Sequence, residues 1–345
     1  MARRRLSHRR RGLSHRRRGR PRLALLLAAS CALTAACGGE RPPLVVGSKN
    51  FTEQSILGEL VAGWIERTTT IPVRRRLHLG GTFIAHQALI GGQIDLYVEY
   101  TGTALTAILE HPPVADPDSV RRAVAAEYDR RWSLQWTPPL GFENTFAILV
   151  RRSTADSLGL RTISDAAPHA PGWRPGFGYE FTEREDGLRG LARTYGLRFG
   201  RDPRLMDLGL LYRALASEQV DLVAGNSTDG QIAALNLIML EDDLHYFPPY
   251  EAAPVVRKDA LEAYPQLGPA LRELAGRIDT REMRALNRAV DVDGRDFREV
   301  VRSWIDSELG RTSAGYPTRS GRTSAGQTGV LWAALGLVCS LASRR

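Results

Sequence analysis

Residues 45–54 place a lysine in a turn between a short apolar strand and a helix. The chain holds only two lysines, Lys49 and Lys258, beside forty-five arginines, so a lysine in this turn needs a physical reason. An ammonium group is a compact charge with rotatable donors, which suits a small anion in a confined place. The first N–H groups of a helix add unpaired donors and partial positive charge. The turn therefore predicts either an anion site or a surface loop with a solvated lysine, and the turn alone does not decide between them.

Strands and helices alternate along the first part of the chain. Apolar runs predict strands at 44–46, 72–79 and 95–98. Helices are expected from Glu53, capped by Asn50 or Thr52, and at 82–89 and 104–109. The first helix carries an apolar face made of Ile56, Leu57, Leu60, Val61, Trp64 and Ile65. This alternation indicates an α/β fold with a parallel sheet. Ligands of such sheets bind at the carboxyl ends of the strands, and the polar residues at these ends are Lys49, Thr82, Tyr100 and Thr103.

A second αβ series begins near Ser153, and helices are expected at 264–274, 280–290 and 296–309. Extended connectors near 141–146 and 246–252 join the two series. We therefore expect two lobes with a cleft between them, the first lobe being discontinuous and completed by the C-terminal helices. A hinge of two such chain crossings permits closure around a ligand.

Composition excludes several classes of protein. The net charge of +9 comes from the ends: residues 1–36 hold eleven arginines and 311–345 hold five, both without an acidic residue, so residues 37–310 carry a net charge of −7. An acidic body argues against nucleic-acid binding. The cysteines, Cys31, Cys37 and Cys339, lie outside the body and predict neither disulfides nor a metal site there. No nucleophile elbow, phosphate loop or metal-ligand spacing of histidines indicates an enzyme or a cofactor.

The N-terminus is expected to be a targeting segment. A positive stretch, an apolar run over 23–36 and small residues before a break are typical of a secretory signal, here 1–36. Cys37 after Ala35 and Ala36 resembles the acylated cysteine of a bacterial lipobox, which predicts a lipidated linker at 37–43. The alternative is an ordinary cleaved signal in which Cys37 has no role. At the other end, residues 310–345 are expected to be an appendage, disordered up to about 328 and apolar near its end.

Several blocks of the body together resemble the substrate-binding proteins of osmoprotectant ABC transporters, which bind glycine betaine, carnitine, choline and related quaternary amines. The blocks occur in order at 47–54, 79–82, 95–103, 227–230 and 247–250. The resemblance spans about 44–309 and implies a two-lobed periplasmic-binding-protein fold of type II. It places 44–141 and 251–309 in the first lobe and 142–250 in the second.

The resemblance also implies a ligand site with an aromatic box and a carboxylate clamp. A trimethylammonium group donates no conventional hydrogen bond, so aromatic faces hold it by cation–π attraction. The box would use Tyr100, Phe146 and Tyr250, while Asn226 stands where relatives often have tyrosine. The clamp would use Lys49, Thr103 and Arg184, and Asn144 would lie near the ligand. Without the resemblance, the tyrosines would be read as packing residues and Arg184 as part of a surface charge run.

The function implied is capture of a quaternary ammonium osmoprotectant and its delivery to an ABC permease and ATPase. The protein would be a monomer outside the cell membrane or in the periplasm, held by its lipid, with no nucleic acid and no metal. Two alternatives remain open at this point. One is a binding protein for another small cation or zwitterion, because Asn226 interrupts the box. The other is a ligand-sensing domain.

Overall fold

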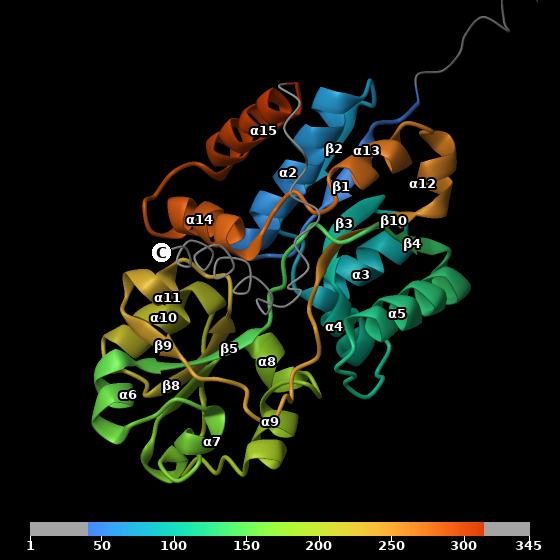
Figure 1. Ribbon diagram of the computed structural model, residues 1–345. Helices are drawn as coiled ribbons and strands as arrows, with labels where there is room; N and C mark the ends of the chain where they lie inside the picture. Colours follow the sequence, from blue (N-terminus) through green and yellow to red (C-terminus); the bar gives the residue numbers. More distant parts are fainter. Residues whose placement is uncertain (1–40, 314–345) are drawn as a thin grey trace, which may run out of the picture. The chain divides into compact units, whose positions relative to one another are not determined.

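A computed structural model of the chain describes residues 41–313, and these form two five-stranded mixed sheets flanked by helices (Figure 1). The predicted signal, Cys37 and most of the C-terminal appendage lie outside the described residues. None of the helices in this part of the chain is long and apolar enough to cross a membrane.

The first sheet has the order β2-β1-β3-β10-β4. Its strands are β1 (Leu44–Gly47), β2 (Val73–Arg76), β3 (Leu96–Tyr100), β4 (Leu134–Trp136) and β10 (Ala252–Arg257). The strand β1 is parallel to β2 and β3, whereas β10 runs antiparallel to β3 and β4. The parallel part matches the sequence prediction. The strands β4 and β10 were not predicted, and β10 brings residues 252–257 back into the sheet begun at Leu44.

The second sheet has the order β7-β6-β8-β5-β9. Its strands are β5 (Phe146–Arg151), β6 (Pro175–Phe177), β7 (Arg204–Leu205), β8 (Leu222–Asn226) and β9 (Leu237–Met239). The strand β5 is antiparallel to β8 and β9, and its first residue, Phe146, pairs with Asn226 at the end of β8. This pairing places both residues at the same end of two central strands of the second sheet.

Helices of the first sheet include the following: α2 (Thr52–Thr68), α3 (Thr82–Ile90), α4 (Thr101–Thr103), the π-helix η1 (Ala104–Ile108), α5 (Pro117–Trp132), α12 (Lys258–Ala263), α13 (Leu267–Glu273), α14 (Thr280–Asp291) and α15 (Phe297–Ser313). The C-terminal helices α14 and α15 pack against α2 (Figure 1). The predicted apolar face of α2 is confirmed, since Ile56, Leu60 and Trp64 are at most 1% exposed. The helix α15 reaches Ser313, beyond the predicted start of the appendage at residue 310.

Helices of the second sheet include α6 (Arg152–Leu158), α7 (Ile163–Ala166), the 3-10 helix η2 (Ala170–Gly172), α8 (Tyr179–Glu183), α9 (Leu188–Tyr195), α10 (Leu208–Ala216) and α11 (Gln231–Ala234). Helices α6 to α9 pack on a core that contains Phe177, Phe181 and Leu191, whereas α10 packs on another that contains Leu211 and Leu215. Each sheet therefore has hydrophobic cores of its own.

Two local predictions are wrong. The helix α2 is preceded by Phe51 with no side-chain cap, and the hydroxyl of Thr52 donates to Asp291 instead, at 2.6 Å. The helix expected at 264–274 starts later than expected, because α13 begins only at Leu267, and a separate helix, α12, ends at Ala263. Pro265 explains the break, since proline disfavours helical backbone at the residue before it.

The two chain crossings lie side by side. The backbone N–H of Asn144 donates to the carbonyl of Tyr250 at 3.1 Å, and that of Ala252 donates to Phe142 at 3.1 Å. Glu143 and Glu251 form an isolated antiparallel bridge between them. At this point Gly102 has a steric role: a Cβ there would lie 2.8 Å from the carbonyl oxygen of Pro249. Only glycine permits so close an approach of the second crossing to α4.

Candidate functional site

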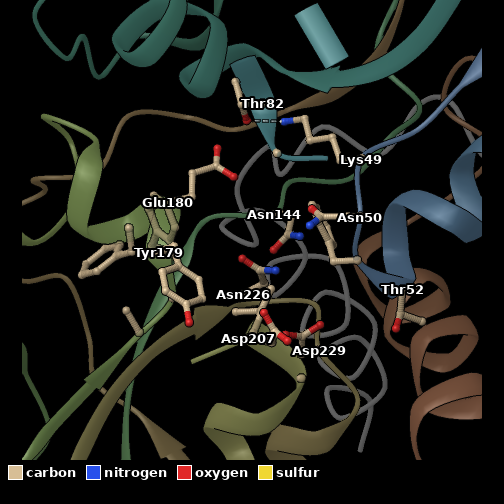
Figure 2. Close-up of a pocket in the computed structure, with 18 of the residues that line it drawn as sticks. Lys49, Asn50, Thr52, Thr82, Asn144, Tyr179, Glu180, Asp207, Asn226 and Asp229 are labelled. Atoms are coloured by element: carbon tan, nitrogen blue, oxygen red, sulfur yellow. Dashed lines mark hydrogen bonds between the residues drawn. The ribbon is translucent and has the colours of Figure 1, made fainter. Parts of the chain in front are cut away.

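A cavity of about 680 Å³ opens between residues of the two sheets, close to the crossings (Figure 2). This volume is in the range of small-molecule sites. Every residue predicted to bind the ligand lines the cavity: Lys49, Tyr100, Thr103, Asn144, Phe146, Arg184, Asn226 and Tyr250. The structure thus brings together residues from sequence positions that span most of the body.

Lys49 lies in the loop between β1 and α2 and is 2% exposed. Its Nζ donates to Glu99 Oε1 at 2.5 Å. It also donates to Thr82 Oγ1 at 2.9 Å (Figure 2). The reading of Lys49 as a solvated surface residue is therefore wrong. Glu99, at the end of the buried strand β3, provides the opposite charge that a buried ammonium requires.

Arg184 lies between α8 and α9, and it too is buried, at 5% exposed. Its guanidinium donates to both oxygens of Asp186, through Nε at 2.7 Å and through an Nη at 2.5 Å. The other Nη donates to Thr103 Oγ1 at 3.2 Å. This hydrogen bond joins the part of the chain that forms the second sheet to α4. Arg184 is thus a buried residue of the cavity and not part of a surface charge run.

Asp186 is the centre of a charged cluster, which we call the Asp186 cluster: Asp186, Arg184, Thr106 and Tyr250. The hydroxyls of Thr106 and Tyr250 each donate to Asp186 Oδ2, at 2.6 Å. Burial alone would raise the pKa of Asp186, but the guanidinium of Arg184 together with the hydroxyls of Thr106 and Tyr250 holds the pKa below its usual range. Asp186 is therefore ionised, and the cluster joins η1, the second crossing and the loop after α8.

A second buried acid, Glu53 on α2, has no cationic partner among the contacts of its carboxylate. We call it and its donors the Glu53 cluster: Glu53, Tyr100, Asn144, Thr228 and Asn287. Tyr100 and Asn144 donate to Oε1 at 2.7 and 2.8 Å, and Asn287 donates to Oε2 at 2.8 Å, as does the hydroxyl of Thr228 at 2.5 Å. Burial raises the pKa of Glu53 despite these hydrogen bonds. Burial, Glu53 and Asp291 also raise the pKa of nearby Asp229 well above its usual range.

The aromatic residues lie at the cavity with the protein's own cations over their rings. Lys49 Nζ lies 5.2 Å from the centre of the Tyr100 ring, and the guanidinium carbon of Arg184 lies 5.0 Å from that of Phe146. The rings of Phe146 and Tyr250 meet edge to face at 6.0 Å. Tyr100 and Tyr250 are 4% and 2% exposed. One face of Tyr100 and one of Phe146 are thus already engaged by a cation in this state of the protein.

Polar groups line the side of the cavity around Asn226. Asn226 ends β8, and Figure 2 shows it near Asp207 and Asp229. Asn144 donates to Glu53, while its Oδ1 is buried without a hydrogen-bond partner. This part of the lining offers amide and carboxylate groups together with Tyr212, whose hydroxyl donates to Asp229 and accepts from the backbone N–H of Asn226.

Sequence reasoning missed the acids of the site, namely Glu53, Glu99, Glu180 and Asp186. A signal was present for Glu99, because an acidic residue inside the apolar run 95–100 needs a buried partner. Asp186 follows Arg184 by two residues, but nothing in that spacing shows that both side chains are buried.

The family model for the substrate-binding domain of ABC-type glycine betaine transport systems matches residues 42–307. The chain is 35% identical to an ergothioneine transport permease/ergothioneine binding protein of Helicobacter pylori, over 82% of this chain and 51% of the relative. The chain thus spans about half the length of that relative. It is 33% identical to a carnitine transport binding protein of Listeria monocytogenes, over 77% of this chain and 87% of the relative.

A crystal structure of a glycine betaine/carnitine/choline ABC transporter protein matches with a TM-score of 0.65 and 33% identity, over 77% of this chain and 98% of that chain. This likeness confirms the expected α/β fold of type II periplasmic binding proteins. The chain belongs to the family of substrate-binding domains of ABC-type glycine betaine transport systems.

Proposed function

We propose that this protein captures a quaternary ammonium osmoprotectant, such as glycine betaine, choline or carnitine, and delivers it to an ABC permease with its ATPase. The observation that carries the proposal is the convergence of the predicted clamp and box residues on one cavity, in a chain of this family. The protein acts by binding and not by catalysis, with ligand contacts shifting an equilibrium between open and closed states.

The charge of the lining favours a ligand with a cationic group. Lys49 and Arg184 are its cations, whereas its acids include Glu180, Glu183 and Asp207. Lys49 forms an ion pair with Glu99, and Arg184 forms one with Asp186, so the charges of the two cations are neutralised. The excess of negative charge attracts an ammonium group, and the ring edges and faces of Tyr100, Phe146 and Tyr250 then provide contacts that need no hydrogen bond.

The same proposal includes the place of the protein in the cell. It works as a monomer on the extracytoplasmic side, with Cys37 carrying a lipid that holds it to the membrane, and it binds no nucleic acid. The boundaries proposed for its parts remain 44–141 and 251–309 for the first lobe and 142–250 for the second. The two sheets and the paired crossings support this division.

Calorimetry of the purified full chain with glycine betaine, choline and carnitine tests the ligand class. We expect saturable binding of at least one of them and no binding of glycine, which lacks the methyl groups. Tyr100→Leu should weaken binding about tenfold, which corresponds to about 1.4 kcal/mol and lies within the range of a cation–π contact.

Tyr100→Phe is the matched control for that variant, because it keeps the ring and loses only the hydroxyl that donates to Glu53. Its affinity should stay within about threefold of the parent, a difference of under about 0.7 kcal/mol. Absence of binding to all three amines would refute the proposed ligand class. Equal affinities for the Leu and Phe variants would refute the role of the ring.

A second candidate ligand is a larger zwitterion, and the side chain of Asn226 favours it. An amide beside carboxylates prefers a ligand that has N–H donors at this end, as the imidazole-thione ring of ergothioneine does. One relative is named for binding ergothioneine. Adding ergothioneine to the calorimetry decides between the two: tighter binding of ergothioneine, lost in Asn226→Leu, would favour the larger ligand.

A further inference from the structure

We infer that Glu180 occupies the place where a ligand's carboxylate would bind, and so biases the site toward quaternary amines without a carboxylate. This inference rests on the proposed function. It concerns a residue that belongs to neither the box nor the clamp, and it makes Glu180 a determinant of specificity.

The position of Glu180 supports the inference that it occupies the place of a ligand's carboxylate. Glu180 belongs to α8, in the half of the chain that forms the second sheet, yet its carboxylate reaches the first half. Its Oε2 lies 3.2 Å from where a Cβ of Gly81 would be. Its Oε1 accepts from an Nη of Arg184 at 3.4 Å. Figure 2 shows the same carboxylate on the side of the cavity where Thr82 and Lys49 lie.

The surroundings of this carboxylate are those of an anion site. Gly81 directly precedes α3, and no side chain caps this helix. The N-terminus of a helix without a cap attracts negative charge through its unpaired N–H groups. Burial would raise the pKa of Glu180, but the nearby ammonium of Lys49 and guanidinium of Arg184, together with a hydrogen bond to Thr82, lower it. Glu180 is therefore ionised, and its carboxylate is attracted by the N-terminus of α3, by Lys49 and by Arg184.

The charges around Glu180 determine whether the site attracts or repels a ligand's carboxylate. Lys49 is paired with Glu99 and Arg184 with Asp186, so the two cations are already neutralised before Glu180 is counted. With Glu180 in place, the local charge is negative, and a carboxylate brought by a ligand would be repelled. Such a ligand must first displace Glu180, whose side chain is 35% exposed and can turn toward solvent. A ligand such as choline, which has the ammonium and no carboxylate, binds with Glu180 unmoved.

The test compares glycine betaine with choline in the full chain and in Glu180→Gln, by calorimetry. We expect the ratio of the choline Kd to the betaine Kd to rise at least tenfold in the variant, because the competing charge is gone. Glu185→Gln is the matched control, since Glu185 is 66% exposed and pairs with Arg189 at the surface. Its ratio should equal that of the parent protein.

A ratio in Glu180→Gln within twofold of the parent, or one shifted toward choline, overturns the inference while leaving the proposed function intact. If the parent protein binds neither of these ligands nor carnitine, the proposed function itself fails, and the two failures are thereby distinguished. Should Glu180→Gln fold poorly, Glu180→Asp retains the charge but withdraws it from Gly81, and it should shift the ratio in the same direction by a smaller factor.

Discussion

The Asp186 cluster and the Glu53 cluster are two buried carboxylates in the same site with opposite electrostatics. Asp186 accepts from two hydroxyls and a guanidinium, and its pKa is lowered. Glu53 accepts from four neutral donors, and its pKa is raised. The carboxylate with the larger number of neutral hydrogen bonds is the one that favours its protonated form. Around Asp186 the charge of Arg184 adds to the hydroxyl hydrogen bonds and the sum outweighs burial, whereas around Glu53 the four neutral donors do not outweigh it.

The difference also separates two tasks within the site. The Asp186 cluster fixes a charged guanidinium beside Phe146 and Thr103. The Glu53 cluster links α2 to Thr228 near the second sheet and to Asn287 on α14, without adding a cation. Charge is thus concentrated at one part of the cavity, while the other part is connected by hydrogen bonds.

The largest effect is expected for Asp186→Asn. This variant leaves Arg184 buried without its bidentate partner, and breaking a buried ion pair from one side costs about 3–5 kcal/mol. Urea denaturation of the ligand-free protein should show a loss of that size in the free energy of unfolding. The double variant Arg184→Met with Asp186→Asn serves as control and should regain part of the loss. A cost below about 1 kcal/mol for Asp186→Asn would remove the distinction between the clusters.

A smaller effect is expected for Glu53→Gln. The amide keeps one acceptor oxygen but presents its NH₂ group to donors, so some of the donors of the Glu53 cluster lose their partner. Each unsatisfied buried group costs about 1–3 kcal/mol, and no full charge is left unpaired. The same urea experiment measures this, with the exposed Glu262→Gln as control. A loss as large as that of Asp186→Asn would show that the two clusters do not differ in the way described.

The smallest effect is a pH dependence of opposite sign in the two clusters. The raised pKa of Glu53 means that the folded protein keeps a proton which the unfolded chain has lost above about pH 4.3. The stability that the parent has over Glu53→Gln should therefore decrease as pH rises through this window, by at most about 1.4 kcal/mol per pH unit. For Asp186 the pKa is lowered, so the advantage over Asp186→Asn is present above about pH 3.9 and lost as pH falls.

Unfolding curves of the parent and both variants from about pH 2.5 to about pH 8 measure the two slopes, because the Asp186 advantage is lost only below about pH 3.9. Parallel slopes would contradict the comparison, because they would place both carboxylates in the same ionisation state throughout.

The sequence predicted the parts of the fold that depend on local periodicity. The apolar face of α2, the parallel strands β1, β2 and β3, and the crossings near 141–146 and 246–252 could all be read from patterns of apolar and turn residues. The strand β10 could not, because its sequence contains Pro254 and it is defined by antiparallel pairing with β3, more than a hundred residues earlier. Pairing at that distance leaves no local signal.

The residues of the site also divide into those that could be predicted from the sequence and those that could not. Side chains that act on a ligand could be named from family resemblance, and they line the cavity. The acids that compensate Lys49 and Arg184 could not, since their role depends on burial and on contacts between distant segments. Glu180 is the extreme case: its carboxylate belongs to one half of the chain and its electrostatic surroundings to the other.

The π-helix η1 has a consequence for chain length. A π turn accommodates one more residue than an α turn over the same rise, so η1 behaves as a one-residue insertion after α4. This extra residue sets the rotation at which Thr106 leaves the helix, and Thr106 reaches Asp186 while Thr103 reaches Arg184. A relative that lacks the extra residue would continue as an ordinary α-helix and turn its hydroxyl away from the aspartate. We therefore expect that deletion of a single residue between positions 104 and 108 would disrupt the Asp186 cluster.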